Sequence, residues 1–345
     1  MSVDKSFRLK DCHTALPKQL GFSLVELMVA STIGLIVLGA VGYFYLGARQ
    51  SFRTTDNLSR IQENARLAIE TMARDIRMAG YVGCANLQTA TVNTIANPPV
   101  TPLTAATAIT GEDFSAAVPA YLGTIITRPA GDTISVGGAF RGGVSLTGNL
   151  DPSNANVQIA GNPYGFAKDD VLMVTSCTSA DIFRATTVSS GSGTVTITHS
   201  SSTNTGNRVG TYNSGGQVLK MDRYTYFIGT NTAGKRALYR TNIAEGTPED
   251  TTELVEDVWD MQIEYGQDTD ADGSADTYAD ATAVGANWAQ VVSARISLLL
   301  ASADNNIVST LQKYKFNGSY VTAASGDKRL FQVLTSTIAL RNRAP

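Results

Sequence analysis

The chain has 345 residues and a formal net charge of −3, from 27 basic and 30 acidic side chains. This acidic balance argues against nonspecific DNA binding, which needs a surplus of lysine and arginine. The length is sufficient to bury a substantial core as one large or two small domains.

The first predicted elements are a basic leader and a long apolar segment. The leader, residues 1–21, carries four basic and two acidic side chains, which are Lys5, Arg8, Lys10, Lys18, Asp4 and Asp11. Residues 22–46 contain one charged residue, Glu26, and about 25 helical residues cross a ~30 Å hydrocarbon core. Because a positive flank stays in the cytoplasm, the pattern predicts a single membrane span with the rest of the chain outside.

Glu26 needs an explanation, because an unpartnered ionisable side chain in lipid costs on the order of 2–3 kcal/mol or more. A secretory signal peptide has a shorter apolar core followed by small residues at its cleavage site. A generic single-span anchor fits the hydropathy, but it explains neither Glu26 nor the Gly21-Phe22 junction.

The leader followed by Gly21-Phe-Ser-Leu-Val-Glu26 resembles the class III signal of type IV prepilins and pseudopilins. The resemblance implies that a prepilin peptidase cuts after Gly21 and N-methylates Phe22. It also implies that Glu26 pairs with the free amino terminus of a neighbouring subunit, which partners the buried charge inside a filament. The expected location is the bacterial inner membrane, with the carboxyl-terminal part in the periplasm, and then the pilus at the cell surface.

The helix is predicted to continue over residues 47–80. Its apolar residues recur at spacings of three and four, at Leu58, Ile61, Ala65, Ala68, Met72, Ile76 and Ala79. Oppositely charged residues four apart lie on the exposed sides, namely Asp56 with Arg60, Arg66 with Glu70, and Glu70 with Arg74. Gly80 is the expected end of the helix.

The remaining chain is predicted to form a sheet domain after a loop-rich insertion. Residues 81–168 are rich in Ala, Thr, Gly, Asn and Pro, with weak alternation only in patches such as Gly123–Thr127 and Asp132–Val136, so we expect mobile loops there. Residues 169–345 contain frequent strand patterns, including an expected hairpin of Val218–Ile228 with Ala237–Thr241. The predicted fold class is α+β and pilin-like, with a long amino-terminal helix, membrane-spanning in its first half, packed on an antiparallel β-sheet.

Three stretches resemble the PilW family of minor pilins, namely Met72–Cys84, Trp288–Leu300 and Ser336–Arg343. This resemblance implies a structural subunit that joins other minor pilins and the major pilin. With an inner-membrane assembly platform and an adhesin near the tip, it would prime type IV pili for twitching motility, adhesion or DNA uptake. Minor pseudopilin J of type II secretion has the same architecture and is the alternative. We expect no direct nucleic-acid binding.

Cleavage after Gly21 would remove Cys12 and leave Cys84 and Cys177. In an oxidising periplasm these two most simply form a disulfide, which closes a loop of about 94 residues and contributes about 4–5 kcal/mol by the chain-entropy relation. Two buried free thiols are the alternative.

An acidic segment, Asp268–Asp276, resembles the first part of an EF-hand calcium loop. Its carboxylates occupy positions one, three, five and nine, as Asp268, Asp270, Asp272 and Asp276, and Gly273 occupies position six. Position twelve is Ala279 where a glutamate is expected, so a solvated acidic turn is the competing interpretation. No cofactor is required, and Ca²⁺ is the one candidate. A membrane-tethered calcium-binding module is therefore a third interpretation of the chain.

The sequence lacks the motifs of common catalytic sites. It has no P-loop, no Cys-x-x-Cys pair and no nucleophile elbow. The mature chain keeps one histidine, His199, which we expect to be a solvated loop residue. Tyr224, Tyr226 and Phe227 are expected to pack within the sheet rather than to form a ligand platform. We therefore predict that the chain is not an enzyme.

Overall fold

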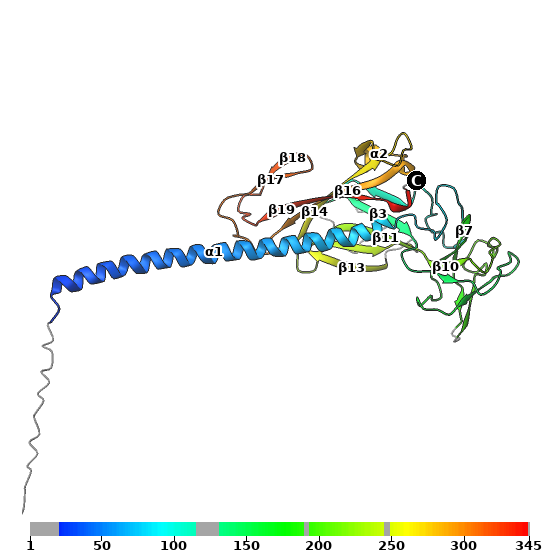
Figure 1. The fold of residues 1–345 in the computed structure, drawn as a ribbon, viewed down its shortest axis with the longest axis horizontal. Helices are drawn as coiled ribbons and strands as arrows, with labels where there is room; N and C mark the ends of the chain where they lie inside the picture. Colours follow the sequence, from blue (N-terminus) through cyan, green and yellow to red (C-terminus); the bar gives the residue numbers. More distant parts are fainter. Residues whose placement is uncertain (1–20, 115–130, 190–192, 245–248, 344–345) are drawn as a thin grey trace, which may run out of the picture. The chain divides into compact units, whose positions relative to one another are not determined.

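The computed structural model describes residues 21–114, 131–189, 193–244 and 249–343. It divides the chain into two compact units, Met1–Arg53 and Thr54–Pro345. Helix α1 (Leu24–Arg77) begins in the first unit and ends in the second, and the described strands follow it (Figure 1). The α+β class with a long amino-terminal helix is confirmed.

The second half of α1 is amphipathic, as predicted. Its buried face contains Ile61, Ala65, Ala68, Met72, Ala73, Asp75 and Ile76. Two of the predicted ion pairs form on its exposed sides, Arg60 with Asp56 at 3.1 Å and Arg66 with Glu70 at 2.7 Å. The helix ends one turn before Gly80, whose φ of +75° lies in the left-handed region that favours glycine.

Two sheets pack with this half of α1 around the main core. The first has the strand order β13-β12-β11-β3-β2 and comprises β2 (Ile109–Glu112), β3 (Thr133–Gly138), β11 (Asp222–Thr230), β12 (Arg236–Asn242) and β13 (Glu249–Glu256). The second has the order β15-β14-β16-β19 and comprises β14 (Val258–Gln267), β15 (Thr277–Ala279), β16 (Val291–Ala301) and β19 (Phe331–Ala339). Met72, Tyr226 and Ile296 are fully buried in their shared core, and an apolar side chain such as Met72 or Ile296 contributes about 1.5–3 kcal/mol by leaving water.

Two further sheets enclose a separate core around Val157, Phe183 and Ile197. One has the order β1-β7-β6-β10-β4 and comprises β1 (Thr91–Thr94), β4 (Val144–Ser145), β6 (Val171–Thr175), β7 (Ser179–Arg184) and β10 (Gln217–Lys220). The other has the order β5-β9-β8 and comprises β5 (Asn156–Ala160), β8 (Thr187–Val188) and β9 (Thr194–Thr198). Among the described strands, β1 pairs with β7 in parallel and the other pairs are antiparallel.

The smaller elements lie in the carboxyl-terminal third of the chain. They are the hairpin of β17 (Lys313–Phe316) and β18 (Ser319–Thr322), the short helix α2 (Ala281–Val284) and two 3₁₀ turns at Trp288–Gln290 and Arg341–Arg343.

The predicted loop-rich insertion over 81–168 needs correction, because β1 to β5 lie within it. Two of these strands, β2 and β3, belong to the same sheet as β11. The alternation at Thr133–Val136 is short, and β3 ends in two glycines and is buried at every position, so the sequence gives only a weak strand signal. The segment Gly123–Thr127 lies outside the described residues.

The predicted hairpin around residues 229–236 is confirmed with one change. Strand β11 pairs with β12 from Tyr224 opposite Asn242 to Thr230 opposite Arg236. The run that begins at Val218 is not one strand, however, because β10 ends at Lys220 and pairs with β6 in a different sheet.

His199 is buried rather than solvated, which corrects the expectation from its Ser and Thr neighbours. It follows Val195 and Ile197 on the buried side of β9, so the alternation of that strand continues through it. Its ring lies 5.1 Å from the ring of Phe183, and neither ring nitrogen has a hydrogen-bond partner among the described residues. Burial lowers the pKa of His199. The unfolded chain therefore binds a proton more readily than the folded chain, and stability falls as the pH drops below about 6.5.

Candidate functional site

The amino-terminal residues of the predicted cleavage motif form the start of α1. Gly21 and Phe22 precede the helix and are exposed. The backbone N–H of Ser23 donates to Oε2 of Glu26 at 2.9 Å, and the backbone N–H of Glu26 donates to Oγ of Ser23 at 3.2 Å. This reciprocal pair is a capping box, which satisfies two backbone donors at the helix start.

Glu26 therefore has a local role that the sequence analysis missed. The pattern Ser-x-x-Glu before an apolar run is visible in the sequence and is the signal of such a cap. Within a single chain the carboxylate is partnered by Ser23. A role in assembly requires Glu26 to exchange or share this partner.

The first half of α1 presents an apolar surface on all sides. Large side chains from Phe22 to Leu46 are exposed, and α1 is long and apolar enough to cross a membrane. Exposed apolar side chains on every face of a helix are characteristic of a segment that is surrounded by lipid or by other helices. This arrangement fits anchoring in the inner membrane.

Asp75 forms a buried polar link between α1 and the first sheet. Its side chain is 2% exposed, Tyr226 Oη donates to its Oδ2 at 2.5 Å, and Arg240 Nη1 lies 3.3 Å from the same oxygen. Burial and the carboxylate of Asp75 raise the pKa of Tyr226, so the phenol stays protonated and donates. The predicted pair of Glu70 with Arg74 is replaced by a contact of Arg74 with Asp75 at 3.3 Å.

The neighbouring aromatic side chains pack within the sheet as expected. Phe227 stacks on Tyr239 with ring centroids 5.7 Å apart, and the guanidinium of Arg240 lies 4.4 Å from the ring centroid of Tyr224. With Tyr226 held by Asp75, these contacts account for all three aromatic residues of β11.

The carboxyl-terminal turn is fixed by a buried guanidinium. Arg343 is 5% exposed, and its Nη1 donates to the carbonyl oxygens of Trp288 and Ala289 at 2.8 Å and of Val291 at 3.1 Å. Its Nη2 donates to the carbonyl oxygen of Ala105. Burial lowers the pKa of Arg343 to about 10. The stretches Trp288–Leu300 and Ser336–Arg343, which were singled out in the sequence, thus meet in the structure.

Cys84 and Cys177 form a disulfide, with their Cα atoms 4.8 Å apart. Cys84 follows the turn that ends α1, and Cys177 lies between β6 and β7. The crosslink therefore connects the segment after α1 to the sheet that contains β6 and β7, and the prediction of a disulfide rather than two free thiols is confirmed.

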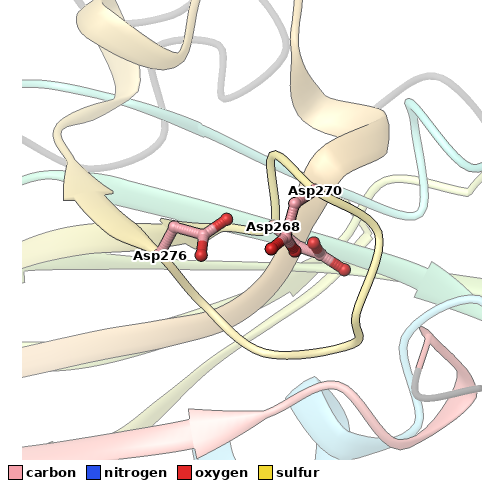
Figure 2. A group of neighbouring side chains, drawn as sticks. All are labelled: Asp268, Asp270 and Asp276. Atoms are coloured by element: carbon pink, nitrogen blue, oxygen red, sulfur yellow. The ribbon is translucent and has the colours of Figure 1, made fainter.

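The predicted calcium loop connects β14 to β15. Figure 2 shows Asp268 and Asp270 on one limb of this loop and Asp276 on the opposite limb, beside β15. One carboxylate oxygen from each of the three lies within 4.8 Å of the others. Asp272 does not belong to this group, and its Oδ1 accepts a hydrogen bond from the N–H of Ser274 at 2.7 Å.

The same carboxylates hold the loop in shape through the backbone. Asp268 accepts hydrogen bonds from the N–H groups of Ala271 at 2.6 Å and Gly273 at 2.8 Å. The hydroxyl and N–H of Thr269 donate to Asp276 and lower its pKa. The loop thus has the internal hydrogen bonds of an acidic turn, and the three carboxylates retain lone pairs that fit a hard cation such as Ca²⁺.

Two segments of the chain match known families. Residues 225–342 match the family Type IV Pilus-assembly protein W, and residues 16–42 match the Prokaryotic N-terminal methylation motif. The first match contains β14, β16 and β19, and the second contains Gly21, Phe22 and Glu26. No curated protein and no solved structure matches the chain. Over these two segments the chain is similar to PilW-like type IV prepilins.

Proposed function

We propose that this chain is a prepilin that primes the assembly of type IV pili as a structural subunit. A prepilin peptidase cuts after Gly21 and methylates Phe22. The segment 22–46 then holds the chain in the inner membrane with its globular part in the periplasm. The assembly platform transfers the subunit into a filament with other minor pilins, the major pilin and an adhesin near the tip.

The observation that carries this proposal is the amino-terminal methylation motif joined to an exposed apolar helix. Such a surface is stable in lipid or against other apolar helices, because contact with water costs about 25 cal/mol per Å² of apolar area. A filament of packed helices surrounds this segment with other apolar helices and also supplies a partner for Glu26. The match over residues 225–342 favours a pilus over a secretion machine.

The proposal is tested by locating the subunit. We expect a deletion strain to lose most surface pili, and the mature chain to be present at low abundance in pili sheared from cells that carry it. Pseudopilin J of type II secretion is the competing assignment. If the chain is absent from sheared pili and its deletion instead stops protein secretion, that assignment is correct.

A separate proposal is that the loop of Asp268, Asp270 and Asp276 binds calcium. Extracellular calcium modules bind at about 10⁻⁴–10⁻³ M, so about 10 mM calcium should stabilise the full chain by about 1 kcal/mol or more. Thermal unfolding with and without calcium measures this effect. Asp268→Asn should abolish it, whereas Asp272→Asn, outside the carboxylate group, should keep it. An unchanged melting temperature of the unsubstituted chain in calcium would show that the loop is an acidic turn only.

A further inference from the structure

One edge of strand β19 is open. Within the described ranges β19 pairs with β16 alone. The N–H of Leu340 donates to the carbonyl of Val292 at 2.9 Å, and antiparallel hydrogen bonds alternate along a strand. The even-numbered residues of β19 therefore bond to β16. The backbone N–H and C=O groups of Val333, Thr335, Thr337 and Ala339 point to the other side.

The beginning of this edge is covered by a side chain. The amide of Gln312 donates to the carbonyl of Phe331 at 2.7 Å and accepts from its N–H at 2.8 Å. Beyond that point, Thr335, Thr337 and Ala339 are exposed. The open edge thus extends over Val333–Ala339.

This edge lacks the features that usually prevent strand pairing. Segment Val333–Ala339 contains no charged residue and no proline, and its register with β16 has no bulge. The other edge of the same sheet, β15, has three residues, and the edge strand β13 carries several carboxylates and irregular pairing. Natural proteins protect long edges with charges, prolines, bulges or shortness, so an unprotected edge of this length indicates a partner.

A groove with no net charge follows the edge. It has a volume of about 390 Å³ and lies between α1, at Ala65 and Ile69, and β19, at Leu334 and Ser336. Two of its lining residues are charged, Arg66 and Glu70, and they form an ion pair with each other at 2.7 Å. A strand added to β19 would place alternate side chains over this groove, and small or apolar side chains fit it best.

Strand β19 runs in the same direction as the second half of α1. Its beginning, at Gln332, lines the groove with Gln62, and beyond its end Asn342 donates to the carbonyl of Ala79 at 3.2 Å. Antiparallel pairing of two β19 strands would therefore set two such helices in opposite directions. In the proposed filament the subunits share a direction, so antiparallel pairing with β19 of a second copy does not fit, and we take a strand of a different subunit as the occupant.

We propose that the open edge of β19 binds an extended, uncharged strand of another pilin-type subunit, which adds to the sheet and covers the groove. This mode of recognition supplies affinity through backbone hydrogen bonds and selectivity through alternate side chains. The proposal rests on the proposed function, because it takes its partner from the same assembly.

Photo-crosslinking of the full chain in its native host tests the proposal. A photoreactive residue at Thr335 should form an adduct with a strand of another subunit that carries the prepilin motif, as mapped by mass spectrometry. The same residue at Thr322, an exposed position on β18, should not form this adduct. Thr337→Pro removes an N–H from the open edge and keeps those that bond to β16, so it should lower the adduct yield roughly tenfold.

A second pair of variants tests the edge even if the proline substitution causes the chain to misfold. Thr337→Glu places a charge on the edge opposite Arg295, and Thr322→Glu places the same charge opposite Lys313. The first should lower the yield and the second should not. An adduct with β19 of a second copy, no strand adduct, or an undiminished yield in Thr337→Glu would each overturn the proposal.

The amino-terminal sequence of the chain in the same samples distinguishes failure of the edge proposal from failure of the proposed function. A chain that starts at Phe22 and gives no adduct overturns the edge proposal and retains the proposed function. A strand adduct from a chain that keeps its leader retains the edge and overturns the proposed function.

Discussion

Replacing Glu26 by alanine is expected to remove the subunit from pili while leaving its level in the membrane unchanged. Glu26 is the one charged residue between Phe22 and Leu46. Loss of one partner from a buried charge pair costs about 3–5 kcal/mol, which corresponds to a fall in incorporation of about a hundredfold or more. The ratio of this subunit to the major pilin in sheared pili, measured by quantitative mass spectrometry, gives the effect.

The capping box allows the charge of Glu26 to be separated from its hydrogen bonding. Glu26→Gln keeps an oxygen that accepts from the N–H of Ser23, because glutamine also forms capping boxes, but it removes the charge. Ser23→Ala removes the reciprocal hydrogen bond and keeps the charge. We expect Glu26→Gln to be lost from pili, as Glu26→Ala is, and Ser23→Ala to be incorporated into pili. Normal assembly of Glu26→Gln would show that Glu26 acts as a helix cap rather than as a charge.

Replacing Asp75 by alanine is expected to destabilise the globular unit by about 3–5 kcal/mol. The substitution leaves the hydroxyl of Tyr226 and the guanidinium of Arg240 without the acceptor that they share in the core. It also removes the polar link between α1 and β11. Urea unfolding of the full chain in detergent measures the loss as a lower midpoint.

Matched variants identify the source of that loss. Asp75→Asn keeps an acceptor for Tyr226 and should cost less than the alanine variant. Glu70→Ala breaks an ion pair on the same helix whose partners are mostly exposed, and it should cost at most about 1 kcal/mol. An Asp75→Ala midpoint equal to that of Glu70→Ala would contradict a structural role for the buried carboxylate.

The elements with strong periodicity were predictable from the sequence. The apolar stripe of α1 gave its buried face, and the two strand-like runs on either side of a Gly- and Asn-containing turn gave the β11–β12 hairpin. The cysteine count after leader removal gave the disulfide. In each case a local pattern or a residue count was enough to predict the structure, because few arrangements of the chain are compatible with that pattern or count.

Asp75 was overlooked although its position is visible in the sequence. It lies three residues after Met72 and four before Ala79, which places it on the apolar stripe rather than among the exposed ion pairs. The partners that satisfy it, Tyr226 and Arg240, come from strands far along the chain. Helical spacing could indicate that Asp75 is buried, but only the tertiary structure identifies its partners.

The strands within 81–168 and the burial of His199 had weaker signals. Strand β3 alternates only over Thr133–Val136 and then continues into two glycines, so its pattern is too short to distinguish a buried strand from a loop. His199 continues the inward-facing series of Val195 and Ile197, but its polar neighbours suggested a loop. Burial of polar residues in a second core depends on packing between sheets that no local pattern specifies.

The most direct test of the account is the intact mass and amino-terminal sequence of the chain recovered from membranes. Processing as a prepilin predicts a chain that begins with N-methylated Phe22 and lacks residues 1–21. A chain that retains the leader, in cells with an active prepilin peptidase, would contradict the account and favour a membrane-tethered module.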